Sequence, residues 1–339
     1  MGRRDKRYSK TLHQQAYEKL NSMQAFGQSK KDAMKDGTAK DKIFSYNTYK
    51  TYWKHTKYFI SYMKENHPQV TTLGKAEKYV KEFLQFRVDK GHSAWSVQTE
   101  AKALGKLFGI EPGSPNYFEC PKRERSEIKR SRDTAKRDRH FSKANNAELI
   151  NFCKGTGLRR SELEKLKGKD MVNLSQIERR LSELEGKVSL TEKEEKTLAM
   201  LKDVKLYGGR YENFLFVKGK GGRLRLSPII GEHSEDIVAR IRRTGKDENV
   251  WLHVHGGADI HGYRGDYATS IYKAYARDIK DIPYDKKHQG TGRMYQGDVY
   301  TCRKDEAGKK LDKKAMLICS KALGHNRIEV VANNYIRGL

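Results

Sequence analysis

The sequence predicts a mainly α-helical protein of the α+β class, with a small β-hairpin or sheet and two domains joined by a basic linker. The chain has 339 residues, which is enough for two domains with separate hydrophobic cores. Apolar residues recur at helical spacing over most of the chain. One pair of short apolar runs flanks a glycine-rich turn, as in a β-hairpin.

The first third of the chain carries helical patterns. Residues 1–40 are polar and basic apart from an amphipathic stretch at 12–23, and we expect them to form an N-terminal extension. Further helices are expected over three ranges: 45–63, 76–88 and 96–107. Together these helices predict a small all-α domain over residues 41–120.

A strongly basic segment follows at 121–143 and is expected to be an extended linker. Residues 120–143 contain ten Lys or Arg residues and almost no apolar residue. Such a run is either a solvated charged segment or a strap that lies along phosphate groups, and the charge of the whole chain favours the strap. Its candidate DNA-binding residues are Lys122, Arg123, Arg125, Lys129, Arg130 and Arg132.

Residues 144–339 are expected to form the second domain. A Glu-, Lys- and Leu-rich stretch at 175–203 predicts a helical hairpin, which we interpret as a surface insertion. Strand-like runs at 214–217 and 224–226 flank a turn of sequence Gly-Lys-Gly-Gly. The remainder predicts helices over three ranges: 267–278, 313–323 and 328–336.

The composition points to an anionic partner. Lys and Arg total 70 against 43 Asp and Glu, so the formal net charge is +27. Nucleic acid is the leading candidate and an acidic membrane surface is second. No run of eighteen apolar residues could span a bilayer, and no apolar stretch follows the charged N-terminus as in a secretory signal. Four cysteines without a Cys-x-x-Cys pair predict reduced thiols in a cytosolic setting.

Arg159 is the first candidate for chemistry. It lies at the predicted start of a helix, on the same face as Leu163 and Leu166. An inward arginine at a helix N-terminus can bind an anion such as phosphate through its own charge and the free backbone N–H groups. The structural alternative is an ion pair with Glu162.

Three further candidates lie downstream. Lys220, at the tip of the hairpin, could protonate a leaving oxygen if nearby cations lower its pKa, although exposed turn lysines are common. Tyr300 and Arg303 would share a face if residues 298–305 are helical, with Arg303 as a second phosphate ligand. The alternative for this pair is an ordinary surface contact.

The C-terminal segment is the most informative. Tyr335 continues the apolar stripe formed by Ile328, Val331 and Ala332, so its hydroxyl is expected to point inward. For a tyrosine taken alone, a place in the core is the more common explanation.

Two segments of the second domain resemble the tyrosine recombinase (phage integrase) family. Residues 156–163 read Thr-Gly-Leu-Arg-Arg-Ser-Glu-Leu and match the family's first box without a gap, which places its arginine at Arg159. Residues 217–225 look like the family's lysine hairpin, with Lys220 in the catalytic position.

The closing box completes the resemblance. Residues 323–325, Leu-Gly-His, and Tyr335 match it in the family's order. The resemblance covers residues 145–339 and extends by helical pattern alone over 45–120, where the family places a helical core-binding domain.

Three departures from the family's pattern are visible. Tyr300 precedes Arg303 where the family usually has histidine in a His-x-x-Arg box, and a phenol is a poor base at neutral pH. Ten positions separate His325 from Tyr335, where nine are common. Relatives often carry a C-terminal helix that docks on a neighbouring subunit, and with only residues 336–339 after Tyr335 we expect that helix to be absent.

The resemblance implies a site-specific DNA recombinase or integrase, as encoded by mobile genetic elements. Tyr335 would attack a backbone phosphate to give a 3′-phosphotyrosine and a free 5′-hydroxyl. Arg159, Arg303 and His325 would hold the charge on the phosphoryl oxygens, and Lys220 would protonate the leaving oxygen. No cofactor and no metal is required by this chemistry. The histidines of the glycine-rich stretch at 253–261 lack a matched carboxylate, which makes zinc binding improbable: His253, His255 and His261.

The resemblance also implies partners. Double-stranded DNA recombination sites would be the substrate, a homotetramer would assemble on two duplexes, and excision or DNA-bending factors would assist. A cytoplasmic location, on the nucleoid in a bacterium, and no membrane association are expected. Two alternatives remain open at this point: a type IB topoisomerase-like enzyme, and a catalytically degenerate, sequence-specific DNA-binding protein.

Overall fold

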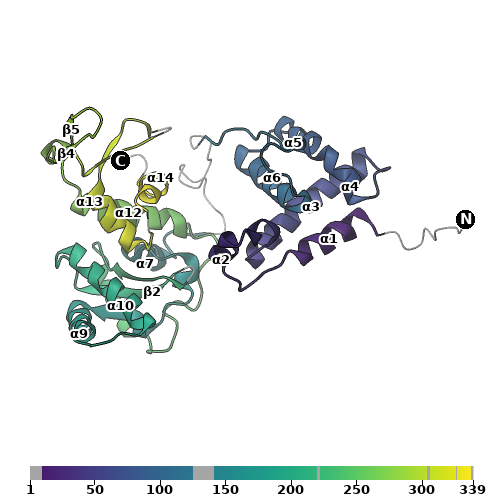
Figure 1. Cartoon of the computed structure of the whole chain (residues 1–339). Coiled ribbons are helices and arrows are strands. Elements are labelled where there is room, and N and C mark those ends of the chain that lie inside the picture. The colour runs from purple at the N-terminus through teal and green to yellow at the C-terminus, as the bar shows by residue number, and fades with distance from the viewer. Residues whose placement is uncertain (1–9, 125–140, 220–221, 304–305, 326, 337–338) are drawn as a thin grey trace, which may run out of the picture. The chain divides into compact units, whose positions relative to one another are not determined.

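The computed structural model describes residues 10–124, 141–219, 222–303, 306–325, 327–336 and 339 (Figure 1). It divides into two compact units, Met1–Glu127 and Ile128–Leu339. In agreement with the sequence, the fold is α+β: mainly helical, with small antiparallel sheets that all lie in the second unit. None of the described helices combines the length and the hydropathy needed for a membrane span.

The regular elements described in the first unit are all helices, apart from an isolated bridge between Gln24 and Ile43. Its α-helices are α1 (Leu12–Ser22), α2 (Lys30–Lys35), α3 (Tyr46–Asn66), α4 (Leu73–Ala76), α5 (Val80–Asp89) and α6 (Ala94–Phe108). Short 3₁₀ turns lie at Thr38–Asp41 and Glu77–Tyr79. The helices expected near 45–63, 76–88 and 96–107 therefore form α3, α5 and α6, with α5 beginning a turn later than expected because the 3₁₀ turn precedes it.

Helix α1 is part of the core of this unit. Its Leu12, Ala16 and Leu20 are buried together with side chains of α3 and α6. The reason is the spacing of these three residues, which places them on one face of the helix. Residues 12–22 thus pack into the helical unit, although the sequence assigned them to an extension over 1–40.

A buried ion cluster joins three helices of the first unit. The carboxylate of Glu100 on α6 has no solvent exposure and accepts hydrogen bonds from Nε (3.0 Å) and Nη2 (2.8 Å) of Arg87 on α5. Nδ1 of His55 on α3 lies 3.4 Å from the same carboxylate. Burial lowers the pKa of His55, so Arg87 supplies the positive charge that Glu100 needs.

The second unit begins with α7 (Ala147–Thr156) and α8 (Arg160–Leu163). A three-stranded antiparallel sheet follows, in the order β1 (Met171–Asn173), β2 (Asn213–Lys218) and β3 (Leu224–Pro228). Strands β2 and β3 form the predicted hairpin, with Val217 opposite Arg225. A 3₁₀ turn at Gly168–Asp170 leads into β1.

The predicted helical hairpin is present between β1 and β2 as α9 (Leu174–Glu185) and α10 (Glu192–Lys202), followed by a 3₁₀ turn at Asp203–Tyr207. It is more than a surface insertion. Ile177, Leu181 and Leu184 of α9 and Met200 and Leu201 of α10 are buried in the largest core cluster of this unit, and α10 packs on β3. The apolar residues at helical spacing on α9 account for this packing.

The remaining elements complete the second unit. They are α11 (Ser234–Arg242), α12 (Ile260–Tyr275), a 3₁₀ turn (Ile279–Asp281), β4 (Lys286–Lys287), β5 (Met294–Tyr295), β6 (Val299–Thr301), β7 (Lys310–Asp312), α13 (Lys313–Ala322) and α14 (Glu329–Asn334). Strand pairs β4–β5 and β6–β7 are each antiparallel. Residues 298–305 were expected to be helical if Tyr300 and Arg303 were to share a face; this condition is not met, because Val299–Thr301 pairs with β7 as a strand.

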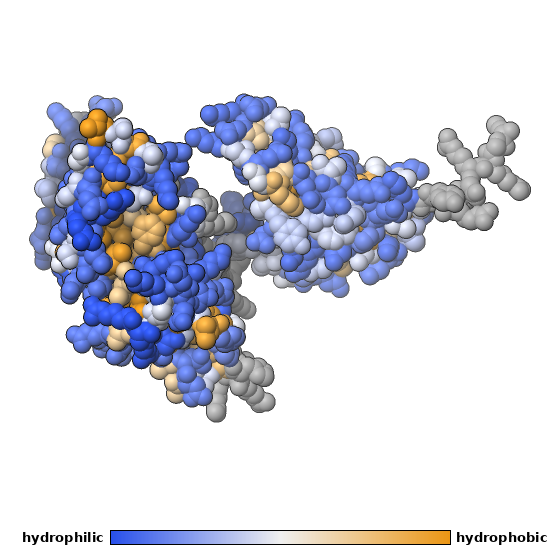
Figure 2. Space-filling model, turned by 90° about the horizontal axis from the view of Figure 1, so that it is seen from below, coloured by the Kyte–Doolittle hydropathy of each residue, from blue (hydrophilic) through white to orange (hydrophobic). Residues whose placement is uncertain are grey.

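The surface and the thiols agree with the composition. On the face drawn in Figure 2 most side chains are hydrophilic, and apolar ones gather in a few patches. All four cysteines are free, and three of them are buried. Burial raises the pKa of the Cys153 and Cys319 thiols to about 12, so both are unreactive.

Candidate active site

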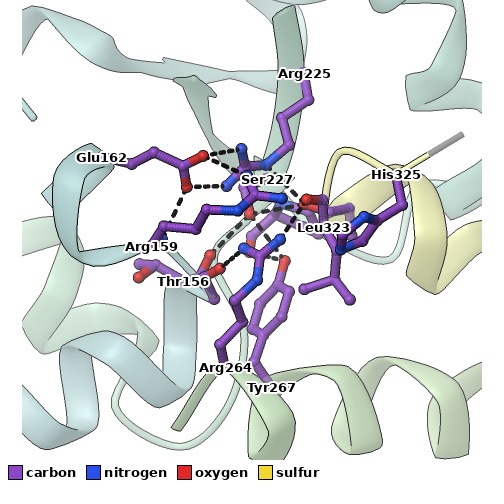
Figure 3. A network of polar contacts seen from close by, with 12 residues as sticks. Thr156, Arg159, Glu162, Arg225, Ser227, Arg264, Tyr267, Leu323 and His325 are labelled. Atoms are coloured by element: carbon purple, nitrogen blue, oxygen red, sulfur yellow. Dashed lines mark hydrogen bonds and ion pairs between the residues drawn. The ribbon is translucent and has the colours of Figure 1, made fainter. Parts of the chain in front are cut away.

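Three arginine side chains converge in the second unit where four segments meet. Figure 3 shows the guanidinium groups of Arg159, Arg225 and Arg264 close together, with Glu162 on one side and His325 on the other. The segments are the turn between α7 and α8, strand β3, helix α12, and the chain that leaves α13. Both motifs that carried the resemblance, around Arg159 and around His325, therefore meet in one place.

Arg159 is held by Glu162. Its Nη1 donates to Oε1 of Glu162 at 2.6 Å, and its backbone N–H donates to Oε2 at 2.8 Å. Helix α8 is only four residues long, and the carboxylate already occupies the N–H group that was expected to be free for an anion. The anion-binding capacity of Arg159 therefore lies in its guanidinium, whose side chain remains 31% exposed.

We call Arg159, Arg225 and Arg264, together with Glu162, the cluster. Arg264 is its most buried cation. Its side chain comes from the second turn of α12, with a residue exposure of 1%. Nη1 donates to the Gly157 carbonyl, Nη2 donates to the Leu323 carbonyl, and Nε donates to the Tyr335 hydroxyl at 3.3 Å. Burial, helped by the neighbouring Arg225 cation, lowers the pKa of Arg264 to about 10, so it stays charged at neutral pH.

Tyr335 lies next to the guanidinium of Arg264, and His325 lies next to Tyr335. Helix α13 ends with Gly324 in a left-handed conformation (φ +70°), and the His325 N–H donates to the Ser320 carbonyl at 2.8 Å. This turn directs the imidazole towards Tyr335, whose hydroxyl lies 3.3 Å from Nε2 of His325. Tyr335 itself follows α14 and is 7% exposed.

The phenol has a defined hydrogen-bonding direction. An arginine Nε can only donate, so the Tyr335 oxygen accepts from Arg264. The phenolic proton is then available to His325, whose Nε2 must be the unprotonated ring nitrogen for this second bond to form. The pair can thus move the proton from Tyr335 to His325.

The cluster has an excess of positive charge. In the part of the chain that the structure describes, the hydrogen bonds and ion pairs of Arg159, Arg225 and Arg264 reach one carboxylate, Glu162, which leaves a net charge of two positive units. Among the described residues, Arg264 has no hydrogen bond or ion pair with a carboxylate, and its donors go to neutral oxygens. An uncompensated cationic site of this kind favours an anion.

The protonation of His325 should report on that anion. Burial, followed by the charges of Arg264, Arg159 and Arg225, lowers the pKa of His325 to about 4. A bound phosphate offsets these charges, so we expect the pKa to rise when inorganic phosphate or DNA is added. Titrating the ring resonances of His325 by NMR measures both states; an ordinary value near 6.5 in the free protein, unchanged by phosphate, would contradict this charge arrangement.

The same shift has a consequence for stability. Because the pKa is lower in the folded chain than in the unfolded one, the unfolded chain takes up a proton first as the pH falls. The free energy of unfolding therefore falls as the pH falls from about 6.5 to 4, because His325 is protonated in the unfolded chain and still neutral in the folded one. Above that range this loss is absent.

Not every predicted site residue reaches the cluster. Tyr300 on β6 is half-buried against the core, and Arg303 is exposed after that strand. No hydrogen bond or ion pair joins either residue to Tyr335 or His325 in the part of the chain that the structure describes. The structure thus places Arg264, rather than Arg303, beside the tyrosine.

The other predictions are only partly visible. Lys220 lies outside the described residues, as do four of the linker residues: Arg125, Lys129, Arg130 and Arg132. Lys122 and Arg123 are exposed, and the Arg123 guanidinium lies 5.7 Å from the ring centre of Trp95. Gly219, next to Lys220, lies over the cluster: a Cβ there would be 3.2 Å from Oε1 of Glu162. The turn of the hairpin therefore begins beside the site.

A direct signal for Arg264 existed in the sequence. Residues 261–264 read His-Gly-Tyr-Arg, a literal His-x-x-Arg box, and the ring of His261 lies 5.4 Å from that of Tyr335. The segment was taken for a glycine-rich stretch before a helix at 267, whereas α12 already begins at Ile260. Arg225 lay within the hairpin motif and was given no role. Its position opposite Val217, near the start of β3, carries no signal of burial.

The described residues contain no group of three His, Cys, Asp or Glu side chains that could hold a metal ion. His253 and His255 lie near each other, with ring centres 6.4 Å apart. Nδ1 of His255 accepts a hydrogen bond from the Gly257 N–H.

Comparisons with known proteins give two solved structures of interest. No protein-family model and no curated protein matches the chain. The chain is similar to the Tn1549 transposon integrase (residues 82–397) in complex with circular intermediate DNA, at 14% identity and a TM-score of 0.35, over 97% of this chain and 96% of that one. It is also similar to XerA recombinase, at 14% identity and a TM-score of 0.23, over 94% and 92%. At such low TM-scores neither likeness supports an inference about this chain's activity. The activity is inferred from the contacts of Tyr335 with Arg264 and His325.

Proposed function

We propose that this protein is a site-specific DNA recombinase that cuts and rejoins DNA strands through a 3′-phosphotyrosine on Tyr335. The observation that carries the proposal is the position of the phenol. Its oxygen lies 3.3 Å from both Nε of Arg264 and Nε2 of His325, beside a cluster with two uncompensated positive charges. A nucleophile, a proton acceptor and an anion site are thus held together.

The reaction can be written with its atoms balanced. The Tyr335 oxygen bonds to the phosphorus and its proton passes to His325, while the bond from phosphorus to the 5′ oxygen breaks. The 5′ oxygen takes a proton and leaves as a hydroxyl. Lys220, which directly follows Gly219 in the hairpin turn, is the proposed donor. Rejoining is the reverse, with a 5′-hydroxyl as the attacking group.

Arg159 and Arg264 are the proposed ligands of the phosphoryl oxygens. Negative charge builds on these oxygens during the attack, and two guanidinium groups fixed in advance stabilise it without reorganising. Removing one such donor typically costs about 3 kcal/mol of transition-state stabilisation. Arg264 takes the role for which the sequence had suggested Arg303.

A covalent adduct tests the proposal. The protein is incubated with duplexes from the DNA that flanks its gene, each nicked so that the 5′-hydroxyl fragment diffuses away and rejoining is prevented. We expect a denaturation-resistant DNA–protein adduct whose modified peptide contains Tyr335. Binding to these duplexes without any adduct would instead support the catalytically degenerate DNA-binding protein. Relaxation of supercoiled plasmid that lacks paired sites would support the topoisomerase.

We also propose the binding partners of this protein. The basic linker residues, with Lys122 and Arg123 exposed at its start, would bind the phosphate backbone, and DNA affinity should then fall steeply with salt. A homotetramer on two duplexes, accessory factors and a cytoplasmic location are expected from the resemblance.

A further inference from the structure

Arg225 is a buried cation that the proposed reaction does not use. It is 4% exposed on β3, and its guanidinium lies beside the carboxylate of Glu162 (Figure 3). Its Nη1 and Nη2 donate to the two carboxylate oxygens of Glu162 at 2.9 and 2.8 Å, and its Nε donates to the Ala322 carbonyl at 3.0 Å. All three of these hydrogen bonds go to groups inside the protein, which suits a structural role for the side chain.

The carboxylate that Arg225 binds is the one that orients Arg159. Glu162 accepts from Arg225 on both oxygens and from Arg159 on both, once through the side chain and once through the backbone. Burial alone would raise the pKa of Glu162, but the hydrogen bonds and charge of Arg225, followed by those of Arg159, hold it at about 2. Glu162 therefore remains charged because Arg225 is there.

Arg225 also contacts the segment that carries His325. The Ala322 carbonyl lies at the end of α13, three residues before His325, and accepts from Nε of Arg225 at 3.0 Å and from the Ser227 hydroxyl at 3.4 Å. Gly324 packs directly on Arg225, since a Cβ at that position would lie 2.8 Å from Cδ of the arginine. One guanidinium thus fixes both the turn with Arg159 and the turn with His325.

We propose that Arg225 is a positioning residue that sets the distance between Arg159 and His325, acting through Glu162 and the end of α13. The inference rests on the proposed function. A catalytic group displaced by about an ångström can lower a rate about 100-fold. We expect an effect of that size when the contacts of Arg225 with Glu162 and Ala322 are removed.

Arg225→Lys is the main test, with Arg277→Lys as the matched control. Arg277 also holds a buried carboxylate with two donors, Nε and Nη2 on Asp312 at 2.7 and 2.8 Å, away from the cluster. A lysine at either site loses the two-pronged geometry and should lower the melting temperature to a similar degree. Only Arg225→Lys should lower the single-turnover cleavage rate at saturating DNA, about 100-fold, while Arg277→Lys stays near the wild-type rate.

The pH profile separates positioning from loss of stability. Arg225→Gln removes the cation beside Glu162, so the pKa of that buried carboxyl should rise towards the working pH range. Protonated Glu162 loses its charge and one of its oxygens becomes a donor, so its bonds to Arg159 weaken. Cleavage by this variant should therefore fall as the pH falls from 8 to 5.5 more steeply than cleavage by the wild type. A merely structural role would lower the rate equally across the range.

The outcomes are distinct. Wild-type-like cleavage by Arg225→Lys, or equal losses in Arg225→Lys and Arg277→Lys, would overturn the positioning role. Absence of an adduct with the wild-type protein would overturn the proposed function instead. In that case binding of inorganic phosphate, followed through the His325 ring resonances, still tests Arg225: an affinity about tenfold weaker in Arg225→Lys supports the inference, and an unchanged affinity refutes it.

Discussion

Replacing Arg264 by lysine is expected to lower the rate of strand cleavage about 1,000-fold, whereas Arg303→Lys should leave it within a factor of about three. Arg264 uses three separate donors, one each for Gly157, Leu323 and Tyr335, and it is almost completely buried. A lysine ammonium carries its donors on a single nitrogen and cannot reach acceptors spread around a planar guanidinium.

The loss should fall on the chemical step. Arg264 contacts the attacking oxygen and is one of the two proposed ligands of the phosphoryl group, so its absence affects the transition state more than the bound DNA. Single-turnover cleavage of the nicked duplex measures this step, and salt-dependent DNA affinity serves as a separate readout. We expect the affinity to change less than tenfold, because many phosphate contacts contribute to it.

Arg303→Lys is the control that shows which of the two arginines, Arg264 or Arg303, takes part in cleavage. Its side chain is exposed after β6, and no hydrogen bond or ion pair in the described residues joins it to the cluster. If Arg303→Lys proved as inactive as Arg264→Lys, the free protein would have to rearrange around DNA, and the site described above would not be the reacting arrangement. If only Arg303→Lys were inactive, the assignment of Arg264 would be wrong.

The sequence located the site through residues that are close together in the chain. Arg159 with Glu162, and His325 with Tyr335, fall within short motifs, so their spacing alone indicated which side chains could meet. The alternative considered for Arg159, an ion pair with Glu162, is present as well. It does not compete with phosphate binding, because the shared carboxylate neutralises only one of three guanidinium charges.

Arg264 was missed, in spite of its His-x-x-Arg motif, because the start of its helix has weak local signals. Gly262 and Gly265 both lie within α12 and disfavour a helix, so the sequence favoured a later start. Burial of Ile260, Tyr267 and Ile271, with an N-cap from Asp259 to the Gly262 N–H, outweighs that preference. Tertiary packing of this kind cannot be read from a local pattern.

The apparent pair of Tyr300 and Arg303 failed for a similar reason. A spacing of three residues aligns two side chains only on a helix, and Val299–Thr301 is a strand that pairs with Lys310–Asp312. The partner strand lies several residues further along the chain. Alternation of apolar and polar residues over only three positions is too short to predict a strand. The role of Arg225 was out of reach too, since its contacts join segments 63 and 97 residues apart.

Tyr335→Phe is expected to abolish the covalent adduct, a loss of at least about 10,000-fold, because it removes the oxygen that forms the bond to phosphorus in the proposed reaction. The substitution removes one oxygen that bonds Arg264 and His325, which should change the free energy of unfolding by only about 1 kcal/mol. DNA binding should persist, since the arginine cluster and the basic linker residues are unaltered.

Tyr300→Phe is the matched control for this loss. It removes a phenolic oxygen from another partly buried tyrosine of the same unit, one that the sequence had placed in the catalytic set and the structure places on β6. Both variants and the wild-type protein are compared on the nicked duplex under denaturing conditions. An adduct that survives in Tyr335→Phe would assign the nucleophile elsewhere, and loss of the adduct in Tyr300→Phe alone would point to that tyrosine. Because the two substitutions remove the same atom, a difference between them can only come from where that oxygen lies relative to Arg264 and His325.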